Sequence, residues 1–167
     1  AQSAKVLTGL GASMFNVHAI GGESMMRAAA QAVAETADSL KIARPKLIAV
    51  TVLTSMNAAE WQKLDYTMPI AEQVVHLAKL VKQSGLDGVV ASPQEASLIR
   101  QECGSDFLIV TPGIRPQGFA ADDQSRIATP AGALAAGASH LVIGRPITAA
   151  ADPVAAAAAI LAEMEAL

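Results

Sequence analysis

The run KLIAVTVL, residues Lys46–Leu53, is apolar at almost every position after its first. A strand with one solvent-exposed face alternates apolar and polar residues, so a near-continuous run predicts a strand buried on both faces. Such strands belong to parallel sheets covered by helices. Similar apolar runs recur along the chain and give five predicted strands in all: Ser13–Ala19, Lys46–Leu53, Gly88–Ala91, Phe107–Thr111 and His140–Ile143.

Helical segments separate the predicted strands. Between Pro69 and Ser84 the apolar residues recur at helical spacing and form one face, and Gly85 then ends the segment. Further helices are predicted at Ala1–Leu10 and from Glu23 to about Leu40. A regular alternation of strands and helices indicates an α/β protein with a parallel sheet.

Three short patterns mark further helix starts. Ser92-Pro93-Gln94-Glu95 has the spacing of a capping box, in which the serine and the glutamate side chains each accept from a backbone N–H. Thr129-Pro130 and Asp152-Pro153 repeat the order of an N-cap residue followed by proline. A helix is therefore expected after each of the last three predicted strands.

Two architectures are compatible with this order: an open doubly wound sheet, or part of a (β/α)8 TIM barrel. Five strands cannot close a barrel, and a complete barrel usually needs about 250 residues. The sequence also begins in a helix that no strand precedes. We expect residues 1–167 to form a single domain, and we expect the natural polypeptide to have an N-terminal stretch ahead of Ala1.

The composition excludes several classes of partner. With 12 Lys and Arg against 15 Asp and Glu, the chain has no basic excess for nucleic acid. No apolar run approaches the roughly 20 residues that span a bilayer, and no signal peptide opens the chain. The single cysteine, Cys103, cannot form an internal disulfide. We expect a cytoplasmic protein without nucleic-acid or membrane partners.

The loops after the last two strands are the strongest candidates for a binding site. Ligands of both architectures bind at the carboxyl ends of the strands, and in barrels the last two loops frequently hold phosphate. Thr111–Pro116 reads TPGIRP and leads into the long stretch Gln117–Ile127, while the final strand ends in Gly144-Arg145. A guanidinium binds phosphate bidentately, so Arg115 and Arg145 are predicted to flank a phosphate site. The alternative is two surface arginines paired with aspartates, namely Asp122, Asp123 or Asp152.

Other polar residues give weaker signals. Thr54 follows a strand and could bond the edge of a base, although such hydroxyls are as often loop caps. His18 shares a strand face with Asn16 and is predicted to be a core or rim residue. His76, His140 and Cys103 are predicted to be structural. No cluster has metal-ligand spacing, so we expect no metal site, and no dinucleotide or Walker motif is present.

Several of these segments resemble one family, orotidine 5′-monophosphate decarboxylase, in order and along essentially the whole chain. The combination of TPGIRP with IGRPIT is specific to it, whereas either motif alone would be modest. The segments are FNVHAIGG (Phe15–Gly22), VTVLTSM (Val50–Met56), GLDGVVASPQEA (Gly85–Ala96), VTPGIRPQG (Val110–Gly118), DDQSRIATPAGALAAG (Asp122–Gly137) and LVIGRPIT (Leu141–Thr148).

The resemblance implies a TIM barrel of which this chain supplies strands four to eight, in a cofactor-free homodimeric enzyme that converts orotidylate to UMP and carbon dioxide. It implies that Arg145 and the backbone of Gly144 hold the 5′-phosphate and that Arg115 completes the phosphate end. Gln124 would bridge the phosphate and the pyrimidine, and Thr54 would bond the polar edge of the base.

The family's Asp-x-Lys-x-x-Asp signature, whose lysine protonates the carbon left by decarboxylation, is absent from this chain. We therefore nominate no catalytic residue here. Two other readings stay open: another phosphate-binding barrel enzyme, such as a sugar-phosphate decarboxylase or synthase, and a non-catalytic nucleotide-binding fragment.

Overall fold

The computed structural model describes residues 1–116 and 126–165. Within them the strands form one five-stranded parallel sheet, with neighbours in the order β1-β2-β3-β4-β5. Each strand lies inside a predicted apolar run, so all five predictions are confirmed. The strands are β1 (Met14–His18), β2 (Lys46–Val50), β3 (Gly88–Val90), β4 (Leu108–Thr111) and β5 (His140–Leu141).

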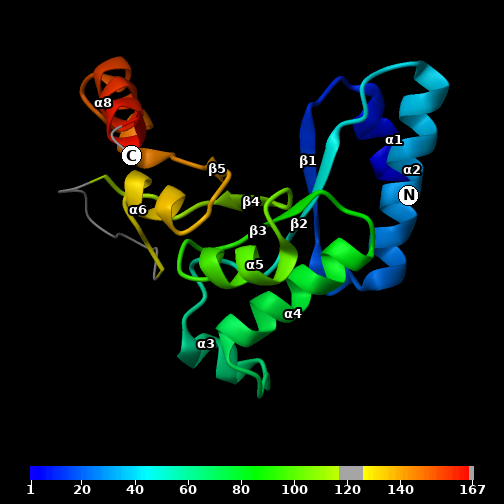
Figure 1. Ribbon diagram of the computed structural model, residues 1–167, viewed down its shortest axis with the longest axis horizontal. Helices are drawn as coiled ribbons and strands as arrows, with labels where there is room; N and C mark the ends of the chain where they lie inside the picture. Colours follow the sequence, from blue (N-terminus) through cyan, green and yellow to red (C-terminus); the bar gives the residue numbers. More distant parts are fainter. Residues whose placement is uncertain (117–125, 166–167) are drawn as a thin grey trace.

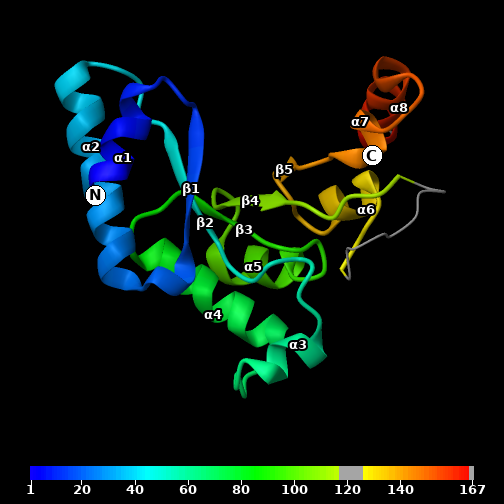
Figure 2. The same ribbon diagram turned by 180° about the vertical axis from the view of Figure 1, so that it is seen from behind.

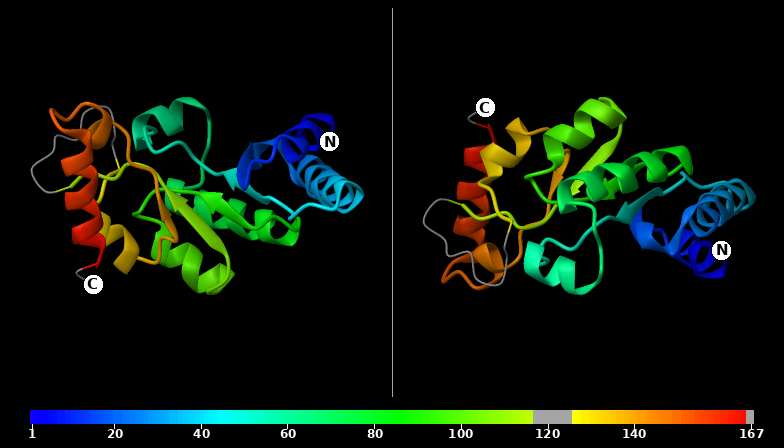
Figure 3. Two further views of the ribbon diagram at one scale, coloured as in Figure 1. Left: turned by 90° about the horizontal axis from the view of Figure 1, so that it is seen from above. Right: turned by 90° about the horizontal axis from the view of Figure 1, so that it is seen from below.

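Helices follow the strands along the sheet. Figures 1 and 2 show α1 and α2 beside β1, α4 and α5 along the middle of the sheet, and α8 beyond β5. Seen from above and below, α1 and α8 lie at opposite ends of the molecule (Figure 3). The helices are α1 (Gln2–Gly9), η1 (Ala19–Gly21), α2 (Glu23–Leu40), α3 (Ala58–Lys63), α4 (Ile70–Gln83), α5 (Ala96–Cys103), α6 (Pro130–Ala135), α7 (Arg145–Thr148) and α8 (Pro153–Glu165).

The order of the strands decides between the two predicted architectures. A doubly wound sheet reverses its strand order at a switch point, and ligands bind there. Here each strand pairs with the next one along the chain, without a reversal. This is the order of successive strands in a TIM barrel. The chain therefore supplies five βα units of a barrel.

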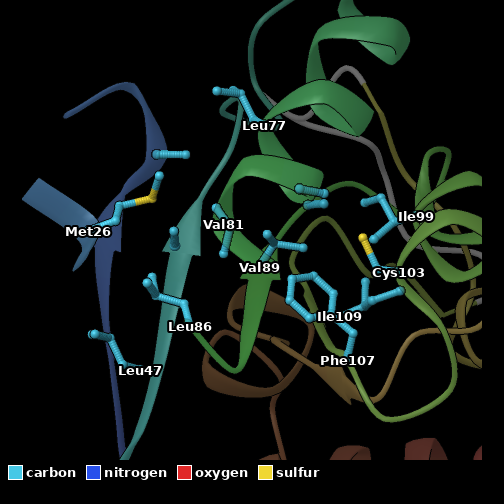
Figure 4. Packing of buried hydrophobic residues seen from close by; sticks show 14 of the residues in the cluster. Met26, Leu47, Leu77, Val81, Leu86, Val89, Ile99, Cys103, Phe107 and Ile109 are labelled. Atoms are coloured by element: carbon cyan, nitrogen blue, oxygen red, sulfur yellow. The ribbon is translucent and has the colours of Figure 1, made fainter. Parts of the chain in front are cut away.

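The core lies between the sheet and its helices. Leu47, Val89 and Ile109 point from β2, β3 and β4 to the helical side, where Val81 of α4 and Ile99 of α5 meet them, and all five are fully buried. Figure 4 shows these side chains within the buried cluster. Close packing of this kind holds the sheet and the helices together.

The other face of the sheet is less buried than predicted. His18, Val50 and Val90 are register partners that face away from this core; His18 is exposed and the two valines are only half-buried. Successive side chains of a strand point to opposite faces, so an apolar run supplies both faces whether or not a second layer covers them. The prediction of complete burial on both faces is therefore wrong at these three positions, whereas Val110, the register partner of Val90, is buried.

Two of the three predicted cap signals are confirmed. The Thr129 hydroxyl accepts a hydrogen bond from the Gly132 N–H (3.1 Å) at the start of α6. The Asp152 carboxylate accepts from the N–H groups of Val154 and Ala155, each at 3.0 Å, at the start of α8. These bonds satisfy N–H groups that have no partner inside the helix.

The capping box predicted at Ser92–Glu95 does not form. The Ser92 hydroxyl accepts from the Gln94 N–H (3.2 Å), and α5 begins only at Ala96. The Glu95 carboxylate accepts instead from the guanidinium of Arg126 (2.7 Å). A charged donor offers a buried carboxylate a stronger hydrogen bond than a backbone amide does, so the ion pair replaces the cap.

Gly88 is a position where the fold requires glycine. A Cβ there would lie 2.5 Å from the Cβ of Leu108 on the neighbouring strand, and still nearer to its backbone oxygen. We expect Gly88→Ala to lower the free energy of unfolding by about 1–3 kcal/mol, the usual cost of overpacking. Urea denaturation measures it. Gly9→Ala is the control, because its Cβ would meet Leu40 at an ordinary 3.8 Å; equal losses in both variants would contradict the prediction.

Candidate functional site

Four of the five nominated residues line one pocket at the carboxyl end of the sheet. Its volume is about 190 Å³. The loops after β2, β4 and β5 all contribute to it, so the parallel sheet brings together segments that lie far apart in sequence. The lining residues are Thr54, Pro112, Gly113, Arg115, Val142, Gly144 and Arg145. The fifth nominated residue, Gln124, lies outside the described residues.

The loop after β4 forms the first wall. Gly113 has a positive φ of 78°, which turns the chain directly after Pro112. The Arg115 N–H then donates to the Ala128 carbonyl (2.9 Å), and the Ala128 N–H donates to the Gly113 carbonyl (3.3 Å). Ile114, between them, is fully buried. This backbone bridge fixes the loop that carries Arg115.

Arg115 itself is only 7% exposed although it lines the pocket. Its guanidinium donates to the Ile114 carbonyl (3.0 Å). Burial of this long side chain, together with the hydrogen bond, limits the positions that its charged end can take. A buried guanidinium at a pocket wall is a strong donor for an anion because little water competes for it.

The loop after β5 forms the second wall. The Val142 N–H donates to the Thr111 carbonyl (2.9 Å), which carries the pairing of β4 and β5 up to the pocket. Gly144 precedes the short helix α7, and Arg145 begins it with an exposed side chain. A Cβ built on Gly144 would meet no atom of the described residues within 4 Å. The backbone of Gly144 is therefore open to a ligand in the pocket.

The charge of the pocket suits an anion. Its only ionisable lining groups among the described residues are the guanidinium groups of Arg115 and Arg145. Of the three aspartates considered as partners, Asp152 caps α8, whereas Asp122 and Asp123 lie outside the described residues. Arginine presents a planar set of donors that matches a phosphoryl group. The charge of the lining therefore suits an anionic group such as a phosphate monoester.

Thr54 forms the third side of the pocket and is 8% exposed. The backbone just before it is held by Arg126, whose guanidinium donates to the Leu53 carbonyl (2.9 Å) and the Val52 carbonyl (3.4 Å). Arg126 was not nominated from the sequence, and Glu95 was nominated only as a cap. Their pairing could not be read from spacing, since 31 residues separate them.

The remaining candidates lie away from this pocket. His18 and Asn16 share one side of β1 as predicted, but both are exposed, so His18 is not a core residue. Cys103 is buried; burial raises the pKa of its thiol, and the charge of Lys82 lowers it less. Among residues 1–116 and 126–165, no group of three or more His, Cys, Asp or Glu could hold a metal ion. The same residues contain no helix long and apolar enough to cross a membrane.

Known proteins are similar to this chain along most of its length. The chain is 54% identical to the orotidine 5′-phosphate decarboxylase of Moorella thermoacetica, over 99% of this chain and 66% of that protein. It is 55% identical to the Halorhodospira halophila protein of the same name, over 94% of this chain and 64% of that protein. The chain thus spans slightly less than two thirds of the length of these curated relatives.

Solved structures agree in fold. The crystal structure of orotidine 5′-phosphate decarboxylase from Lactobacillus acidophilus superposes with a TM-score of 0.82 at 42% identity, covering 97% of this chain and 67% of that one. The family model for orotidine 5′-phosphate decarboxylase / HUMPS matches residues 1–160. With its strand order, its loop motifs and its relatives in agreement, the chain belongs to the orotidine 5′-phosphate decarboxylase / HUMPS family.

Proposed function

We propose that this chain is the phosphate- and base-binding part of an orotidine 5′-monophosphate decarboxylase, a carboxy-lyase of pyrimidine biosynthesis that forms UMP and carbon dioxide without a cofactor. The observation that carries the proposal is the common pocket of Arg115 and Arg145, with Thr54 and Gly144 in its wall. Arg145 and the Gly144 N–H would bind the 5′-phosphate from one side and Arg115 from the other. Thr54 would bond the polar edge of the base, and Gln124 would bridge base and phosphate.

Binding at this pocket is remote from the carbon that reacts. Such binding energy accelerates a reaction only if reacting groups are also in place, because it must be expressed in the transition state. The chain contains no Asp-x-Lys-x-x-Asp sequence, and the curated relatives are longer than the chain. We propose that the proton donor and the charged groups around the carbanion belong to the part of the family's length outside these 167 residues.

The decarboxylation itself is tested by following the loss of orotidylate ultraviolet absorbance. A polypeptide that contains this chain together with the rest of the family's length is expected to turn over orotidylate. The 167-residue chain alone is expected to bind UMP without turnover. No turnover by the longer polypeptide would overturn the proposed activity.

The two other readings give different results in the same experiments. A sugar-phosphate enzyme of this family would turn over a hexulose phosphate in preference to orotidylate. The two relatives described above, at 54% and 55% identity, are both named orotidine 5′-phosphate decarboxylase, which favours orotidylate. A non-catalytic nucleotide-binding protein would bind UMP tightly as a monomer and leave orotidylate unchanged in every form tested.

Gly144→Ala tests the close approach of the phosphate to the backbone. The added methyl group has room in the protein, but it would stand between a phosphate oxygen and the Gly144 N–H. Loss of one hydrogen bond to a charged group, about 1.5 kcal/mol, predicts roughly tenfold weaker UMP binding. Calorimetry with UMP measures the change, and the melting temperature is expected to stay within a few degrees of wild type. Unchanged affinity would place the phosphate elsewhere.

We also propose a cytoplasmic homodimer. The proposal rests on the family to which the chain belongs, whose active site is shared across a two-fold axis. Light scattering of the purified polypeptide measures the molar mass directly, and twice the chain mass is expected. A monomer at micromolar concentration would contradict it.

A further inference from the structure

We infer that Glu95 and Arg126 are a positioning pair that aligns two walls of the pocket, the Thr54 loop and the Arg115 loop. The ligand in question is the nucleotide phosphate of the proposed function, so this part of the inference depends on that proposal. The alignment of the two loops is a property of the chain alone. Neither residue lines the pocket, so neither is proposed to contact the ligand.

The pair joins three segments at the carboxyl edge of the sheet. The guanidinium of Arg126 lies 2.7 Å from a carboxylate oxygen of Glu95, and their side chains are only 8% and 5% exposed. The second terminal nitrogen of Arg126 donates to the Leu53 carbonyl (2.9 Å) and more weakly to the Val52 carbonyl (3.4 Å). Arg126 therefore ties the loop after β2 to the loop after β3.

The backbone beside Arg126 holds the opposite wall. Ala128, two residues further on, exchanges hydrogen bonds with Gly113 and Arg115, at 3.3 and 2.9 Å. The segment from Arg126 to Ala128 thus makes hydrogen bonds in two directions. Its Arg126 side chain donates to Leu53, the residue before Thr54, and its Ala128 backbone pairs with the residues on either side of Ile114. This single segment therefore connects the loop that carries Thr54 to the loop that carries Arg115.

Folding stability alone does not account for a buried Glu95–Arg126 pair, because burying the two charges costs free energy. One oxygen of the Glu95 carboxylate and the Nε of Arg126 are buried and have no hydrogen-bond partner among the described residues. A buried ion pair must repay the loss of hydration of both charges, and apolar residues of similar size often serve folding equally well. What apolar residues could not provide is a rigid set of donors that reaches a carboxylate and a carbonyl of another loop at once.

The test replaces both partners by an apolar residue. In Glu95→Met/Arg126→Met no buried charge is left alone, so the fold is expected to persist. The hydrogen bonds to the Leu53 and Val52 carbonyls are lost, and we expect amide hydrogen exchange in residues 52–55 and 113–115 to become about tenfold faster. In the same variant UMP should bind about tenfold more weakly, because the binding groups lose their alignment.

Arg44→Met is the matched control. Arg44 pairs with Asp87 at 2.9 Å near the amino ends of the strands, away from the pocket. Its loss should leave both pocket exchange and UMP affinity unchanged. If the double variant does not fold, Arg126→Lys, which keeps the charge pair but lacks the second donor group, provides the same two measurements.

The outcomes separate the two proposals. Unchanged exchange and unchanged UMP affinity in the double variant would overturn the positioning role. If the wild-type chain binds no UMP, the proposed function fails, and the exchange measurement still decides whether the pair aligns the loops. Faster exchange in the Arg44→Met control as well would show a general loosening of the fold and would also overturn the inference.

Discussion

Replacing Arg145 by alanine is expected to weaken UMP binding by about 100-fold while uridine binding changes little. A hydrogen bond to a charged group contributes about 1.5–3 kcal/mol, and each 1.4 kcal/mol is a factor of ten in affinity. Arg145 is exposed, so its removal should not disturb the core. Titration calorimetry with UMP and with uridine measures the two affinities.

The control for Arg145→Ala is Arg27→Ala. Arg27 is an exposed arginine on α2 that pairs with Glu23, so the net charge changes equally while the pocket is untouched. Wild-type UMP affinity is expected in this control. If Arg145→Ala weakened UMP and uridine by the same factor, Arg145 would not be acting on the phosphate.

Arg126→Met alone is expected to cost about 3–5 kcal/mol of unfolding free energy, because it leaves the Glu95 carboxylate buried without its charge partner. The Glu95→Met/Arg126→Met variant should recover most of that loss, since no buried charge then remains. Urea denaturation of both variants gives the free energies, and the difference between them is the part of the loss that the additional removal of Glu95 recovers.

Arg44→Met is the control for the stability loss expected in Arg126→Met. The Arg44 side chain is 34% exposed, and exposed ion pairs usually contribute about 1 kcal/mol or less. A small loss is therefore expected. If Arg126→Met cost no more than Arg44→Met, or if the double variant were as unstable as the single one, the electrostatic account of the buried pair would be wrong.

Much of the fold was predictable because it depends on local patterns. The apolar run at Lys46–Leu53 identifies its strand through side-chain character alone, and Thr129 and Asp152 identify helix starts through hydrogen bonds to residues two or three positions away. What sequence could not decide was whether both faces of the strands are covered. Whether a face is buried depends on which other elements pack against it, and the residue pattern of a single strand carries no information about those elements.

The candidate site likewise contains residues that the sequence could predict and residues that it could not. Arg115 and Arg145 could be nominated because parallel strands end at one edge, so residues directly after neighbouring strands meet there. Glu95 was misread because the capping-box spacing is local, whereas its partner Arg126 is 31 residues away. A long-range ion pair leaves no periodic signal, so only the structure reveals it. The role of Gln124 stays a prediction, since it lies outside the described residues.

The convergence of Arg115 and Arg145 on one phosphoryl group is tested most directly by a crystal structure with UMP bound. The account predicts the phosphate between the two guanidinium groups, within hydrogen-bond distance of both and of the Gly144 N–H, with the base toward Thr54. A phosphate held by only one of the arginines, or bound outside this pocket, would contradict it.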